Sequence, residues 1–110
     1  MTPVAYDLRP IRDAILAECR EDHVGLWTII WHLRRMGVQE SQETRRLTMS
    51  LSRDLLSAGM LAGTPTPDGR GFVPWSASAS SILSRIEEAW DALGHEPNIG
   101  DIVWFTAPSA

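Results

Sequence analysis

The chain has 110 residues, 44% of them hydrophobic, and a formal net charge of −4 at pH 7, which fits one ordinary domain with a core of its own. It contains no apolar run of about 18 residues that would span a membrane, and no basic stretch followed by an apolar one that would act as a secretory signal. The single cysteine, Cys19, excludes an intrachain disulfide, so we expect a cytoplasmic protein.

The first two predicted helices span residues 8–20 and 24–36. In both, apolar side chains recur at spacings of three and four residues, the periodicity of a helix that buries one face. Asp7 precedes the first helix as a plausible N-cap. The second helix carries Trp27 and Trp31 beside its apolar stripe. Because more than half of its circumference is then apolar, we expect it to be the central helix.

The third predicted helix, residues 41–58, leads directly into a β-hairpin over residues 60–75. Leucine and threonine side chains form one stripe along this helix. Gly59 ends it, because glycine accepts the left-handed geometry of a helix end. Asp68 and Gly69 stand between two apolar runs, which indicates the turn of a hairpin.

One more helix, residues 80–93, and a short strand, residues 101–106, are predicted after the hairpin. A run of serines precedes the helix and supplies its cap, and a glycine follows it. The strand either joins the hairpin as a third strand or pairs with another chain. The predicted fold is therefore α+β: three helices, a hairpin, a helix and a strand.

The outward side of the third predicted helix is rich in arginine. Arginine pairs with guanine edges and phosphate, and glutamine pairs with adenine, so this side has the composition of a helix that reads a DNA groove. Arginine at the hairpin tip would reach a neighbouring phosphate. A solvated helix face is the alternative interpretation. The residues expected to contact DNA are Gln42, Arg45, Arg46, Met49, Arg53 and Arg70.

The end of the third helix and the hairpin turn share a pattern with a known family. The pattern is Leu51-x-x-x-Leu55-Leu56-x-x-Gly59-Met60-Leu61, followed by Asp68-Gly69-Arg70 before Phe72. Over about residues 26–75 the chain thereby resembles bacterial winged-helix (winged helix-turn-helix) transcription regulators. The resemblance implies a winged-helix domain whose third helix enters the major groove of duplex DNA and whose hairpin touches the DNA backbone.

Acidic residues lead to a second prediction, from another class of function. Glu40 and Glu43 open the presumed reading helix, where they would repel phosphate. A small, acidic, tryptophan-rich domain also fits a protein-binding module, such as a toxin-neutralising immunity protein that sets carboxylates against a basic partner and uses an exposed tryptophan as anchor. The carboxylates in question are Glu18, Glu21, Asp22, Glu87, Glu88 and Asp91.

The sequence shows no pattern for catalysis, a metal or a cofactor. Its histidines are far apart and share no ligand spacing, and no glycine-rich phosphate loop follows a strand. We therefore expect a binding module that is not an enzyme and has no cofactor. Homodimerisation through the last helix or the last strand is also expected, with Trp90, Trp104 and Phe105 in the interface.

Overall fold

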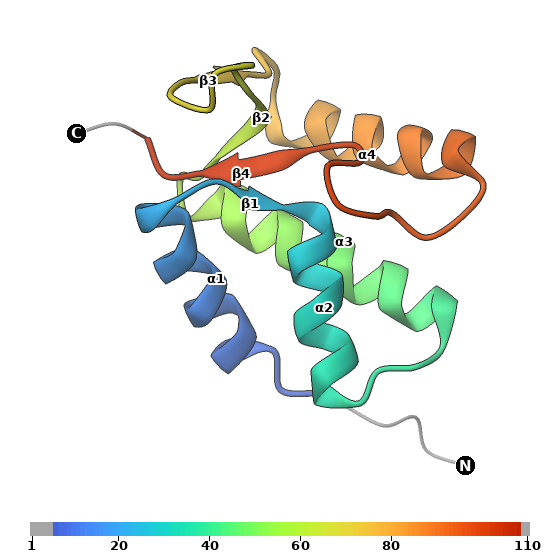
Figure 1. Cartoon of the computed structure of the whole chain (residues 1–110). Coiled ribbons are helices and arrows are strands. Elements are labelled where there is room, and N and C mark those ends of the chain that lie inside the picture. Colours follow the sequence, from blue (N-terminus) through green and yellow to red (C-terminus); the bar gives the residue numbers. More distant parts are fainter. Residues whose placement is uncertain (1–5, 109–110) are drawn as a thin grey trace.

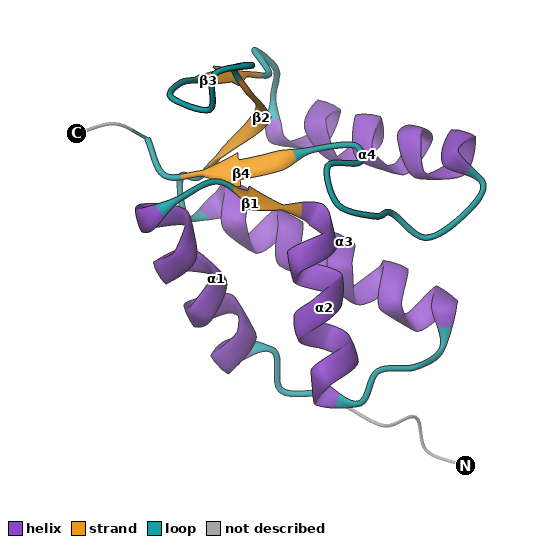
Figure 2. Ribbon diagram, in the orientation of Figure 1, coloured by secondary structure: helices purple, strands orange, loops and turns teal. Residues whose placement is uncertain are grey.

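The computed structural model describes residues 6–108, which form four helices and a four-stranded antiparallel sheet (Figures 1 and 2). Helices α1, α2 and α3 lie against one face of the sheet, and α4 packs against α3. The helices are α1 (Arg9–Glu21), α2 (Leu26–Met36), α3 (Ser41–Ser57) and α4 (Ala79–Leu93). The strands are β1 (Val24–Gly25), β2 (Leu61–Pro65), β3 (Phe72–Pro74) and β4 (Trp104–Thr106). The predicted α+β class is confirmed.

The start of the second helix was predicted too early. Val24 and Gly25 form the short strand β1, which pairs with β4, and α2 begins only at Leu26. The pairing partners of β1 stand about eighty residues away in the sequence, in register Val24↔Phe105 and Gly25↔Trp104. A local periodicity contains no information about such a distant partner.

The first turn of α3 is held by Glu40. Its carboxylate accepts hydrogen bonds from the backbone N–H groups of Gln42, at 3.0 Å, and Glu43, at 2.7 Å. These N–H groups have no partner within the helix, and a negative side chain at this end also favours the helix dipole. From the sequence, Glu40 was expected only to repel the phosphates of DNA. Its structural role is that of the N-cap.

The hairpin is confirmed, and its turn is closed by its own polar groups. Strands β2 and β3 pair antiparallel, and the N–H of Thr66 donates to the carbonyl of Gly71 at 3.0 Å. Asp68 accepts from the Thr66 hydroxyl, at 2.6 Å, and from the N–H of Arg70, at 3.0 Å. The Thr66 hydrogen bond, with the smaller help of the Arg70 N–H, lowers the pKa of Asp68. The Asp68 carboxylate is thus engaged in hydrogen bonds within the turn.

The last strand lies in the middle of the sheet. The strand order is β1-β4-β2-β3, so both edges of β4 are paired within the chain. Joining the hairpin was one of the two predicted outcomes, and it is confirmed through β2. The strand is shorter than predicted, because Ile102 has a φ of +70° and interrupts the extended backbone before Trp104. The alternative prediction, that this strand pairs with another chain, is therefore wrong.

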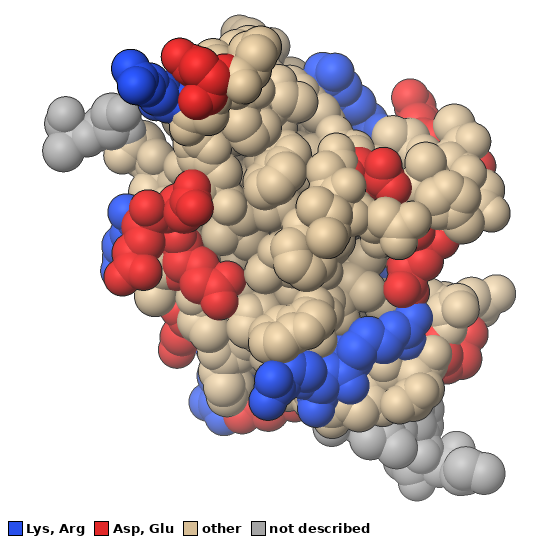
Figure 3. Space-filling model, in the orientation of Figure 1, with Lys and Arg blue, Asp and Glu red and all other residues tan. Residues whose placement is uncertain are grey.

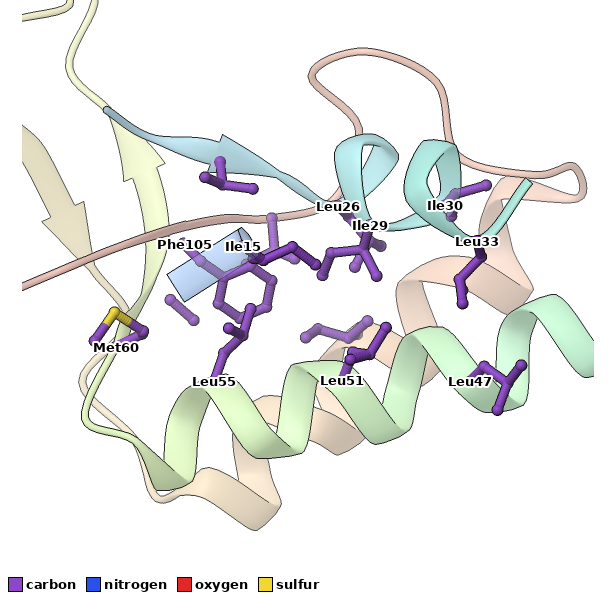
Figure 4. Packing of buried hydrophobic residues seen from close by; sticks show 14 of the residues in the cluster. Ile15, Leu26, Ile29, Ile30, Leu33, Leu47, Leu51, Leu55, Met60 and Phe105 are labelled. Atoms are coloured by element: carbon purple, nitrogen blue, oxygen red, sulfur yellow. The ribbon is translucent and has the colours of Figure 1, made fainter. Parts of the chain in front are cut away.

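The core lies between the sheet and helices α1, α2 and α3. In Figure 4 the ring of Phe105 points from the sheet toward Leu55 on α3. Phe105, Ile15, Leu26, Leu51 and Leu55 all have no exposed surface. The apolar stripes predicted for the first three helices are therefore the ones that are buried.

Candidate binding surfaces

The side of α3 that was expected to read DNA is partly covered by α4. The Arg45 guanidinium donates to Asp91 at 2.7 Å and to Glu87 at 2.6 Å, both on α4. It also lies 5.4 Å from the ring centroid of Trp90. Only 28% of the Arg45 side chain is exposed. The expectation that Arg45 projects into solvent is wrong, because α4 brings two carboxylates and an aromatic ring against it.

The residues expected to contact DNA do not share one open surface. Arg46 is exposed and bonds Glu43 one turn earlier, with 3.1 Å between Nε and Oε2. Met49 and Arg53 line a groove of about 500 Å³ between α3 and α4. Gln42 and Arg45 line a separate depression near the C-terminal end of α4, and Arg70 is at the hairpin tip. The six residues are thus divided among four places.

Arg45→Ala is expected to destabilise the protein as well as to alter its surface. The substitution removes the contacts between α3 and α4 and leaves Glu87 and Asp91 without their partner. Because Asp91 is largely exposed and Glu87 is half-buried, solvent screens both ion pairs, and we expect a loss of only about 1 kcal/mol in the free energy of unfolding. Urea unfolding measures it. Arg46→Ala is the matched control, and an equal loss in both variants would show that Arg45 does not join the two helices.

The candidate carboxylates are divided between two sides of the molecule. Glu87 and Asp91 are bonded to Arg45, and Glu18 lies 3.2 Å from Nε2 of His32 on α2. Glu21 and Asp22, at the C-terminal end of α1, are exposed. Figure 3 shows a red patch over this end of α1. No single acidic surface contains all of the predicted carboxylates.

The outer side of the sheet, away from the core, is covered by aromatic rings. Along β4 the side chains alternate, so Phe105 points into the core and Trp104 points outward. Trp104 pairs with Gly25 on one side and Gly63 on the other, neither of which has a side chain. A Cβ atom added to Gly25 would lie 2.7 Å from Cδ1 of Trp27 and 3.5 Å from Cε3 of Trp104. Both indoles therefore lie over Gly25.

This aromatic cover continues onto β3 and the chain before β1. A Cβ atom on Gly63 would lie 2.9 Å from Cε2 of Phe72, which places the Phe72 ring on the same side of the sheet as Trp104. The rings of Phe72 and His23 are 5.1 Å apart between centroids. Strands far apart in the sheet order are thus bridged by side chains on its outer side.

The aromatic rings on the outer side of the sheet continue along one side of α2. Trp31 follows Trp27 by four residues, and Arg35 follows Trp31 by four, which places all three on one side of the helix. The Arg35 guanidinium lies 4.9 Å from the Trp31 ring centroid, and 45% of Trp31 is exposed. In the part of the chain that the structure describes, Arg35 forms no ion pair. We call His23, Trp27, Trp31, Phe72 and Trp104 the aromatic face.

Charges of opposite sign border the aromatic face. In Figure 3 a wide uncharged area lies between the red patch over the C-terminal end of α1 and a blue patch over the C-terminal end of α2. The charged residues at these two ends are Glu21 and Asp22, with Arg20 beside them, on one side and Arg34 and Arg35 on the other. Arg34 is bonded to Glu96 and to loop carbonyls, so Arg35 is the basic group still available to a partner.

Two of the three residues expected at an interface are part of the monomer's own core. Phe105 has no exposed surface, and only 8% of Trp90 is exposed, beneath Arg45. Their large rings fill space between elements that are far apart in the sequence. Trp104 is half-buried on the aromatic face, where it remains accessible.

The described part of the chain holds no cluster of metal-ligating side chains, and its cysteine is buried. Between residues 6 and 108 no cluster of three or more His, Cys, Asp or Glu side chains is placed to hold a metal ion. Burial raises the pKa of Cys19 to about 12, with a smaller contribution from Glu18. A thiol in that state is not a nucleophile near neutral pH. Within the same residues, no helix is long and apolar enough to cross a membrane.

Comparisons of the chain with protein-family models, with curated proteins and with solved structures found no significant match.

Proposed function

We propose that this chain is a non-enzymatic protein-binding module of winged-helix type, and that its partner docks on the aromatic face. The order of three helices followed by a hairpin supports the winged-helix assignment. Strand β4 is an addition to that arrangement, because it is inserted between β1 and the hairpin. The likeness to DNA-binding regulators concerns the fold, and function depends on the surface residues.

The observation that carries the proposal is the exposed Trp31 with Arg35 stacked on it, beside two further indoles. Tryptophan and arginine dominate the binding energy of protein interfaces, because they bury large apolar areas and still make directed polar contacts. An aromatic residue that remains 45% exposed keeps apolar surface in water until a partner covers it. The rings of Trp27 and Trp104 extend this surface.

The geometry of α3 favours a protein partner over duplex DNA. Arg45 is occupied by α4, and the carboxylates of Glu87, Glu88 and Asp91 lie on the same side as the remaining α3 arginines. Phosphate would be repelled by these carboxylates. Duplex DNA remains the second candidate, because Arg46, Arg53 and Arg70 are exposed and the hairpin follows α3.

Trp31→Ala is expected to abolish capture of the protein partner while the fold is kept. The experiment captures proteins from the source cells on the immobilised chain and compares variants quantitatively. Arg35→Ala should weaken capture of the same protein, because the guanidinium that lies over Trp31 is lost. The matched control is Arg85→Ala, which removes an arginine 3.7 Å from the Trp75 ring, outside the aromatic face. Equal capture by all variants would reject the aromatic face.

Selection from random duplex DNA at two salt concentrations tests the second candidate. Sequence-selective retention that falls steeply with salt, and is lost in Arg53→Glu and Arg70→Glu, would replace the protein-binding proposal by DNA binding. A basic protein such as a toxin is a further candidate, since Glu21 is exposed beside the aromatic face. Capture of a basic protein that is lost in Glu21→Arg would identify it.

A further inference from the structure

We infer that the partner on the aromatic face is a second copy of this chain, an inference that rests on the proposed protein-binding role. The surface is bordered by opposite charges at its two ends. Arg35 lies at the end formed by α2, and Glu21 and Asp22 lie at the end formed by α1, next to His23.

The aromatic face, taken as a strip with acid at one end and base at the other, is complementary to itself. A second copy can be rotated by half a turn about an axis that crosses the middle of the strip and lies in its plane. Its Arg35 then faces Glu21 and Asp22 of the first copy. The same contact is made a second time, because a two-fold interface uses identical patches on both subunits. An unrelated partner would need the reversed pattern, whereas a second copy has it by symmetry.

The middle of the aromatic face is suited to close contact between two copies. Trp27 and Trp104 lie over Gly25, where the absent side chain lets both rings lie close to the backbone. In a two-fold dimer these rings pack against their counterparts near the axis, and Trp31 of each copy packs toward the outer part. Removing these indole surfaces from water is the main stabilising term.

The edges of the sheet are poor alternatives for self-association. The outer strand β3 has three residues, one of them Pro74, which has no N–H to donate. The opposite outer strand, β1, has two residues. Short strands and proline are features by which proteins prevent pairing at sheet edges. The two copies therefore associate face to face.

A charge-swap experiment tests the inference. Sedimentation equilibrium should find a dimer of the wild-type chain that dissociates on dilution. Arg35→Glu and Glu21→Arg, each alone, should weaken the dimer about tenfold or more, since like charges then face each other twice. An equimolar mixture of the two variants should restore the dimer. In the mixture, the acid introduced at position 35 of one copy faces the base introduced at position 21 of the other, and the unchanged Glu21 and Asp22 of the first copy face Arg35 of the second.

The controls separate this inference from the proposed function. Arg53→Glu makes the same change of charge on α3, away from the aromatic face, and should leave the dimer unchanged; thermal melting shows that each variant is folded. A wild-type chain that is monomeric at every concentration would overturn the second-copy inference. So would a dimer that neither charge variant weakens. If another protein is then captured through Trp31, the protein-binding proposal still holds; if none is, both fail.

Discussion

Phe105→Ala is expected to lower the free energy of unfolding by about 3–5 kcal/mol. Phe105 has no exposed surface, and its ring points into the core between the sheet and α3 (Figure 4). The loss has two sources: the transfer of the ring from water and the cavity that remains. The cavity cannot collapse easily, because β4 is held by pairing with β1 on one edge and β2 on the other.

Urea unfolding of the two variants Phe105→Ala and Trp104→Ala measures this difference. The two residues are neighbours on β4 and point to opposite sides of the sheet. Trp104→Ala should destabilise the monomer less and weaken self-association instead, because Trp104 belongs to the aromatic face. If Phe105→Ala lost less than about 1 kcal/mol, the buried position of its ring would be contradicted.

Gly63→Ala is expected to destabilise the protein by about 3 kcal/mol, the upper end of what overpacking costs, or to prevent hairpin formation. A Cβ atom at Gly63 would lie 2.1 Å from the carbonyl oxygen of Val73 and 2.8 Å from the Cα of Pro74. Both are backbone atoms of the paired strand β3, so no side-chain rotation relieves the contact. The strands must separate, and the ring of Phe72 must also move.

Gly71→Ala is the matched control within the same hairpin. The atoms nearest to its added Cβ would all belong to the side chain of Thr66, the closest at 3.2 Å, and a shift of a few tenths of an ångström would relieve that contact. Chemical unfolding should therefore show a much smaller loss for Gly71→Ala than for Gly63→Ala. Equal losses in the two variants would show that loss of backbone freedom, and not the close approach of β3 to Gly63, determines the effect.

The helices and the hairpin were predicted from local patterns, and most of their observed bounds lie within one residue of the predicted ones. The apolar stripes on α1, α2 and α3 are buried because an amphipathic helix packs its apolar side against the core. The turn at Asp68 and Gly69 is also local, since the side chain of Asp68 and the positive φ of Gly69 act within a few residues. Interactions over so few residues are determined by side chains that are close together in the sequence.

The predicted DNA surface depended on a property that a single helix does not possess. Helical spacing correctly places Arg45 off the apolar stripe, but an outward direction on one helix becomes an inward one when another helix packs there. Arg45 lies against α4 because Glu87 and Asp91, more than forty residues later, are brought to it. Nothing near Arg45 in the sequence indicates which element will cover it.

The sequence by itself determined the α+β class, the hairpin, the inner stripes and the richness in tryptophan. Only the tertiary structure decided that β4 is inserted beside β1, that Phe105 and Trp90 are interior, and that Trp27, Trp31 and Trp104 share one face. The physical reason is that secondary structure follows from short-range hydrogen bonding and periodic hydrophobicity. A binding face is made by residues that only long-range strand pairing and helix packing bring together.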